Sequence, residues 1–131
     1  MNTLQGIESI ASKNSVDETT RSLTSSLQQK GIKLFAMIDH SGEAQAAGME
    51  LRPTRLLIFG NPKAGTPIMQ VSQLSGIDLP LKILIWEDEQ KQTWISWNTP
   101  EYLQQRHGFP EELKKNIAAA GALAEAASKS E

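Results

Sequence analysis

Asp39 and His40 are the residues best suited to chemistry in this sequence, because they stand side by side directly after the apolar stretch IKLFAMI. A carboxylate can orient an imidazole for acid/base catalysis, and the two side chains together can bind a divalent metal ion. His107 is the only other histidine. The three residues form no local metal motif, so we assign no metal site and leave any cofactor unknown. The alternative is structural: Asp39 caps the following turn and His40 hydrogen-bonds to the backbone.

A second candidate site is the segment GNPKAGT, residues 60–66, between a predicted strand and a predicted helix. It resembles the phosphate loop G-x-x-x-x-G-K-[ST], but no lysine follows its second glycine and Lys63 is in the wrong place. This difference argues against a nucleotide triphosphatase. A weaker function remains, because a helix that begins near Thr66 would point backbone N–H groups at a carboxylate or phosphate.

The same segment also has an explanation in turn chemistry. Gly60 and Gly65 would serve the turn, Asn61 would make an Asx-type hydrogen bond, and Thr66 would cap the helix. In the anion-site interpretation, Asn61, Lys63, Gly65 and Thr66 contact the ligand instead. Both alternatives stay open at the level of sequence.

Arg52 and Thr54 complete the candidate binding residues, together with His107. Arg52 precedes a predicted strand, and its guanidinium could pair with a ligand anion through two hydrogen bonds. The alternative is a structural salt bridge to a nearby acidic residue: Glu50, Glu87 or Asp88. An anion site at the 60–66 segment would need Arg52 or Lys63 for its fixed charge.

The aromatic residues are concentrated late in the chain, with Trp86, Trp94 and Trp97 in one predicted hairpin and Tyr102 just after it. Trp94 and Trp97 are three positions apart and therefore face opposite sides of a strand. Either the sheet is covered on both faces or an aromatic side chain is exposed to a partner. We therefore expect a homodimer, joined through the sheet surface or the edge of the hairpin.

The order of elements predicts a single two-layer α+β domain with a mixed sheet of about five strands and helices packed mainly on one face. The strand at 32–38 is apolar on both faces, which is typical of an interior strand. We expect the domain to occupy 1–117, and an Ala-rich helical or frayed tail to occupy 118–131 and to be dispensable for folding. The predicted elements are strands at 4–12, 32–38 and 55–59, a hairpin at 81–97, and helices at 16–30, 41–48, 66–76, 100–107 and from 110 onward.

Composition excludes several classes of function. The 131-residue chain has 13 basic and 15 acidic residues, a net charge of −2 and no cysteine, so disulfides and thiolate chemistry are excluded. No basic run interleaves with aromatics, which argues against nucleic acid as a partner. The start of the sequence lacks the pattern of a secretory signal, and no apolar stretch reaches membrane-spanning length, so we expect a cytoplasmic protein without a membrane partner.

The chain also carries, in order, the elements I-D-H, L-R-P-T, F-G-N-P, G-T-P, D-L-P and R-H-G. This order resembles the DUF302 family of small prokaryotic proteins of unknown function. The resemblance covers nearly the whole chain apart from the first few residues and the Ala-rich tail. It implies an α+β fold and a dimer, and it implies no activity for any named residue.

Two functions from different classes follow from these observations. The first is a homodimeric binding or interaction module for a small anionic ligand or a partner. The second is a small-molecule enzyme with His40 as the acid/base, and with an anion pocket at Arg52 and the Gly60–Thr66 segment. The distances among the candidate residues discriminate between the two, because an enzyme needs them in one concave pocket.

Overall fold

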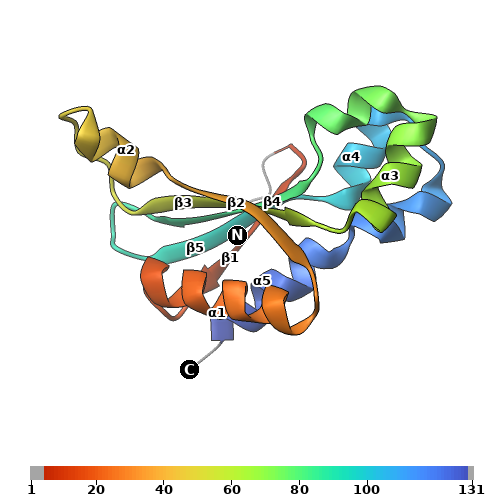
Figure 1. The fold of residues 1–131 in the computed structure, drawn as a ribbon. Coiled ribbons are helices and arrows are strands. Elements are labelled where there is room, and N and C mark those ends of the chain that lie inside the picture. The colour runs from red at the N-terminus through yellow and green to blue at the C-terminus, as the bar shows by residue number, and fades with distance from the viewer. Residues whose placement is uncertain (1–4, 130–131) are drawn as a thin grey trace.

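The computed structural model describes residues 5–129, which form one sheet and the helices packed around it (Figure 1). Leu4, which the sequence places in the first strand, lies outside the described residues. The strands are β1 (Ile7–Ser12), β2 (Lys33–Asp39), β3 (Thr54–Gly60), β4 (Leu81–Glu87) and β5 (Thr93–Asn98). The helices are α1 (Val16–Gln29), α2 (His40–Ala46), α3 (Pro62–Val71), α4 (Pro100–His107) and α5 (Ala119–Lys129), with 3-10 helices η1 (Gln73–Ile77) and η2 (Glu111–Ile117).

The sheet has the order β1-β5-β4-β3-β2, and each neighbouring pair is antiparallel. The two-layer α+β class is therefore confirmed, but the expectation of a mixed sheet is wrong. Parallel pairing was expected because helices separate the early strands. Instead, α1 carries the chain from β1 at one edge of the sheet to β2 at the other, so these two strands are never neighbours (Figure 1).

The hydrophobic core lies between one face of the sheet and helices α1 and α5. Opposed residues of neighbouring strands share a face, and Leu57, Ile83 and Trp97 form one such buried row. Leu23 and Leu27 of α1 pack against this face. Ser15 and Glu18 form a capping box at the start of α1, and Gly31, with a φ of 69°, follows its end. This geometry is typical of a C′ glycine.

Helix α5 is part of this core, whereas the sequence was expected to form an Ala-rich tail at 118–131 outside the domain. Leu123, Ala124 and Ala127 are buried, and α5 packs against α1 and against strands β1, β4 and β5. Alanine buries little area per residue, but its small side chain lets a helix approach its neighbours closely, so a whole alanine face can fill an interior. Ser130 and Glu131 lie outside the described residues.

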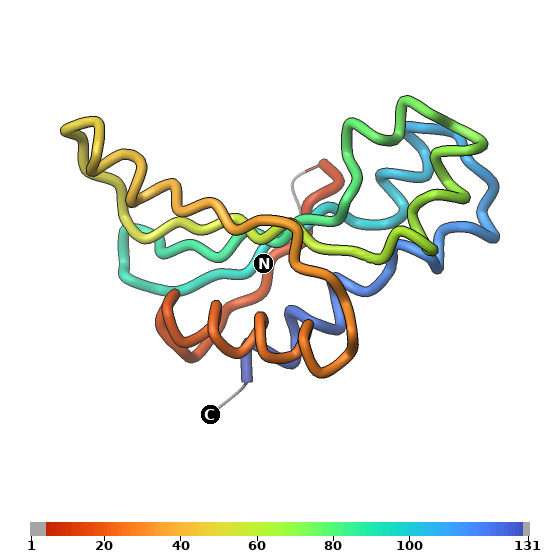
Figure 2. The backbone as a smooth tube through the Cα atoms, viewed as in Figure 1, coloured from red at the N-terminus to blue at the C-terminus, as the bar shows by residue number. Residues whose placement is uncertain are grey.

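Strand β2 is an edge strand, although its apolar pattern predicted an interior one. Leu34, Phe35 and Met37 are exposed, and Met37 is the most exposed of the three at 50%. The hairpin of β2 and β3 and the short helix α2 project from one end of the molecule, while α3, η1, α4 and η2 gather at the other end (Figure 2). The two ends therefore offer separate environments for function.

Candidate functional site

A pocket of about 160 Å³ lies where β3 ends and α3 begins, and we call it the β3-end pocket. The segment from Gly60 to Thr66, singled out in the sequence, forms one wall of it. The pocket is partly open to solvent, and none of its lining side chains is charged. The lining residues are Phe35, Gly60, Asn61, Pro62, Ala64, Gly65, Thr66, Met69, Leu79, Pro80, Leu81, Asn116 and Ile117.

Phe35 reaches this pocket because β2 contains an irregularity. The register of β2 against β3 shifts between Leu34 and Ala36, so Phe35 has no partner of its own on β3. Bulges of this kind re-aim a side chain that regular alternation would direct elsewhere. A Cβ on Gly60 would lie 4.0 Å from Cε2 of Phe35, which places the ring beside the start of the pocket wall. No sequence signal we used predicts this register shift, and Phe35 was missed as a pocket residue.

The N-terminus of α3 differs from the predicted anion site. The helix begins at Pro62 with Asn61 as its N-cap, so Thr66 and Pro67 lie inside the helix. Asn61 Oδ1 accepts a hydrogen bond from the Lys63 N–H at 2.9 Å, and the Asn61 carbonyl accepts from the N–H groups of Ala64 at 2.8 Å and Gly65 at 3.0 Å. Since Pro62 has no N–H, the first turn has no unused donor for an anion. The Asx-type hydrogen bond of Asn61 is present.

Arg52 is not part of the β3-end pocket. It precedes β3, whereas the pocket lies beyond the other end of this seven-residue strand, which is about 20 Å long at the usual rise per residue. The Nε of Arg52 donates to the carbonyl of Glu87 at 3.2 Å, and Thr54 Oγ1 donates to the carbonyl of Arg52 at 2.8 Å. Arg52 and the Gly60–Thr66 segment therefore cannot hold one small anion together.

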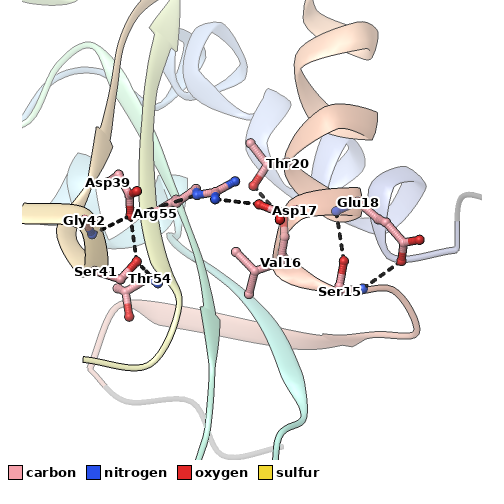
Figure 3. Close-up of polar contacts among 10 residues, drawn as sticks. All are labelled: Ser15, Val16, Asp17, Glu18, Thr20, Asp39, Ser41, Gly42, Thr54 and Arg55. Atoms are coloured by element: carbon pink, nitrogen blue, oxygen red, sulfur yellow. Dashed lines mark hydrogen bonds and ion pairs between the residues drawn. The ribbon is translucent and has the colours of Figure 1, made fainter. Parts of the chain in front are cut away.

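Asp39 is the N-cap of α2, as the structural alternative proposed. Asp39 Oδ1 accepts hydrogen bonds from Ser41 Oγ at 2.6 Å and from the Gly42 N–H at 3.0 Å (Figure 3). The Ser41 hydrogen bond is the main reason that the pKa of Asp39 is lowered, with smaller contributions from Gly42 and from the charge of Arg55. His40 is exposed at the first position of α2.

Arg55 connects this region to α1. Its Nη2 lies 2.5 Å from Asp17 Oδ1, and its Nε lies 4.0 Å from Asp39 Oδ1 (Figure 3). This ion pair was not expected from the sequence, because Asp17 on α1 is remote from Arg55 along the chain. Asp39 and Arg52 do share one broad cleft of about 680 Å³ between α2 and the start of β3. The cleft is polar and open, and His40 does not line it.

His107 lies at the opposite end of the molecule from Asp39 and His40, since α4 and α2 occupy opposite ends (Figure 1). Its Nε2 is 2.6 Å from Asp78 Oδ2, and the same oxygen is 3.2 Å from Nη1 of Arg106. The His107 side chain is only 7% exposed. Within residues 5–129 there is no cluster of three or more His, Asp or Glu side chains that could hold a metal ion. The fold thus separates the three residues that a metal site would have needed.

The second face of the sheet carries two of the aromatic residues that the sequence indicated, Trp86 and Trp94, whereas Trp97 is buried on the core face. Trp86 and Trp94 are opposed in register, with ring centroids 6.4 Å apart and ring planes at 28°. No helix of residues 5–129 lies over this face (Figure 1). We call it the open sheet face. Its central apolar side chains, all half-buried, are Ile38, Leu56, Ile58, Leu84, Trp86 and Trp94.

The fold is that of a two-layer α+β protein with an open antiparallel sheet. Comparisons with known proteins identify its family. The model of the domain of unknown function DUF302 matches residues 8–127. The chain therefore belongs to the DUF302 family. The crystal structure of an uncharacterized conserved DUF302 protein from Bacillus stearothermophilus has the same fold, with a TM-score of 0.77 and 21% identity over 95% of this chain and 97% of that one.

Longer relatives carry a similar segment. Proteins called fluoride-specific ion channel FluC 1, from Brucella suis biovar 1 (strain 1330) and Brucella abortus biovar 1 (strain 9-941), are each 40% identical to this chain over 104 residues. The match covers 79% of this chain, but only 41% and 38% of those proteins. The chain thus spans about two-fifths of the length of these curated relatives. Among residues 5–129, no helix combines the length and the apolar character needed to cross a membrane.

Proposed function

We propose that this DUF302 protein is a homodimeric binding module, and that its two copies pack through the open sheet face. The observation that carries the proposal is the row of apolar side chains on a sheet face that no helix of residues 5–129 covers. A sheet with an apolar face gains stability by burying it against a second layer. Two open sheet faces related by a twofold axis provide that layer for each other.

The chemistry of the face supports a protein surface as its occupant. The Trp86 Nε1–H donates to Ser96 Oγ at 2.9 Å, and the Trp94 Nε1–H donates to Asp88 Oδ2 at 2.8 Å. Both indole donors are therefore satisfied within the chain, and burial of the rings against a partner leaves no unpaired N–H group.

The charge on the face is also compatible with burial. Lys82 is the charged residue of β4 on this side of the sheet, in register with Ile58. Its ammonium group is held near the end of the strand, where it donates to the carbonyls of Asp78 at 3.1 Å and Pro80 at 3.3 Å. The centre of the face, around Leu56 and Leu84, is left without a charge, as expected for an interface core.

The experiment is a comparison of mass by light scattering at micromolar concentration. We expect the wild-type chain to be dimeric and Leu84→Lys to be monomeric with an unchanged far-ultraviolet circular dichroism spectrum. Ser25→Lys, which adds the same charge on the exposed surface of α1, is the control and is expected to stay dimeric. A monomeric wild-type protein, or a dimeric Leu84→Lys variant, would refute the proposal.

A second candidate function is an accessory role beside a fluoride channel. It is favoured by the similarity of this chain to part of the Brucella proteins named as fluoride-specific channels. Domains joined in one chain in some organisms can act on each other as separate chains elsewhere. Deletion of the gene for this protein should then raise the sensitivity of its host to fluoride. Unchanged growth inhibition by fluoride would exclude this function.

A further inference from the structure

We propose that the β3-end pocket binds a small uncharged molecule with an apolar body and one hydrogen-bonding group, about the size of a single six-membered ring. This inference gives the proposed binding module a ligand class. None of the pocket's lining residues is among the six central side chains of the open sheet face. Loss of dimerisation and loss of ligand binding are therefore separate results.

The size of the pocket sets the size of its ligand. An apolar protein cavity of roughly 150 Å³ is known to stay dry and to accept benzene, and the β3-end pocket measures about 160 Å³. Its walls include Met69, Leu79 and Ile117. Binding to such walls is stabilised mainly by the removal of apolar ligand surface from water. The pocket is partly open to solvent, so a ligand can enter it.

The polar groups of the pocket favour an uncharged ligand. Neither a cation nor a carboxylate is among the lining residues, and the first turn of α3 has already used its N–H groups on Asn61. An ion would therefore lose part of its hydration without gaining a partner of opposite charge.

One hydrogen-bonding group of a ligand can nevertheless be satisfied. Among residues 5–129, the Asn61 side-chain nitrogen and the Thr66 hydroxyl make no hydrogen bond to another protein group, while the side-chain nitrogen of Asn116 donates to the Ala64 carbonyl at 3.1 Å. Asn61 and Thr66 can each reach a hydroxyl or carbonyl at the mouth. This combination of apolar walls and a few polar groups is typical of small-molecule sites.

Gly65 provides a precise way to block the pocket. A Cβ added there would lie 3.8 Å from Leu79 Cδ1 and 3.8 Å from Met69 Cε, at ordinary contact distance from two lining side chains. Gly65→Ala therefore fills part of the pocket without a clash, and alanine is also the better helix former. Gly121→Ala is the matched control, because it makes the same change in α5, where the new Cβ would lie 3.6 Å from Trp97.

The experiment is an NMR titration of the full chain with benzyl alcohol, and with benzoate as an anion of similar size. We expect benzyl alcohol to shift the amide signals of Gly60, Gly65 and Ile117 in a saturable way at millimolar concentration, and benzoate to bind more weakly. Gly65→Ala should weaken the affinity for benzyl alcohol about tenfold, with a melting temperature no lower than wild type. Gly121→Ala should leave the affinity unchanged.

Three results would overturn the inference: no shift of these amides at millimolar benzyl alcohol, benzoate binding as tightly as the alcohol, or Gly65→Ala binding like the wild type. The titration is repeated with Leu84→Lys. Benzyl alcohol binding by a monomeric Leu84→Lys variant would support the pocket independently of the dimer. A dimeric wild type that does not bind would leave the dimer intact and reject the ligand class.

Discussion

The Nε2 atom of His107 lies 2.6 Å from Asp78 Oδ2, in a place where the imidazole is almost fully buried. The pair connects α4 to the residue that follows η1, and Arg106 adds a second contact to the same carboxylate oxygen. No space for water lies between the neighbouring side chains Ile68, Leu103 and Phe109. The pair therefore has a structural role: it holds α4 against the end of η1, at one side of the β3-end pocket.

We predict that Asp78→Ala destabilises the protein by about 1–3 kcal/mol, because it leaves buried His107 without its hydrogen-bond partner. Glu101→Ala is the control, since Glu101 makes an exposed 3.6 Å ion pair with Lys114 and should change stability by no more than about 0.5 kcal/mol. Urea unfolding of both variants measures the difference. Equal stabilities would show that the Asp78–His107 contact contributes nothing.

Truncation after Ile117 should abolish folding, because it removes α5 from the core. Burial of the Leu123 side chain alone contributes roughly 2–3 kcal/mol, which is a large share of the usual stability of a domain. Leu123→Ala is the milder test and should cost about 2–5 kcal/mol. The exposed Ala126→Ser is its control. A truncated chain that melts like the wild type would restore the view of a dispensable tail.

The pH dependence of stability should respond to Ser41. The pKa of Asp39 in the folded protein is lowered from 3.8, chiefly by the Ser41 hydroxyl. The charged carboxylate therefore stabilises the fold at pH values above 3.8, and this contribution is lost as the pH falls through the folded-state pKa. Ser41→Ala should raise the Asp39 pKa toward 3.8, as followed by NMR, whereas Ser25→Ala should not. An unchanged Asp39 pKa in Ser41→Ala would contradict the assignment.

Phosphate should not bind at the start of α3. The N–H groups of Lys63, Ala64 and Gly65 already have acceptors on Asn61, and Arg52 lies beyond the other end of β3. We expect the amide signals of these three residues to move no more in phosphate than in a chloride solution of equal ionic strength, in both wild type and Arg52→Ala. Saturable shifts that disappear in Arg52→Ala would establish the anion site.

Local structure followed closely from the sequence. The helix predicted at 16–30 is α1, the hairpin predicted at 81–97 is formed by β4 and β5, and the helix predicted at 100–107 is α4. Gly108 follows α4 in the left-handed conformation, which is typical of a glycine at the end of a helix. These features depend on residues a few positions apart. The family could be identified at the same stage, because the order of short motifs is itself a property of the sequence.

The start of α3 shows how local rules can compete. Thr66 and Pro67 have the pattern of a cap and a first helical proline, but Asn61 and Pro62 have it as well and lie directly after the strand. Asparagine is a stronger N-cap residue than threonine, so the earlier of the two overlapping signals is also the stronger one. In the helix that begins at Pro62, Ile68 packs into the hydrophobic core.

The tertiary structure decided everything that depends on which strand ends meet. Because β2 pairs only with β3 at the edge of the sheet, its apolar side chains are exposed and the shift at Phe35 opens onto a pocket. Helices α4 and α2 lie at opposite ends of the molecule, so His107 is far from Asp39 and His40. Its partner is Asp78 instead. The sequence by itself determined the elements and the family, since these follow from neighbouring residues. Strand order and long-range contacts assign each of these side chains to its site, because pairings between distant segments are selected by the burial of the whole core.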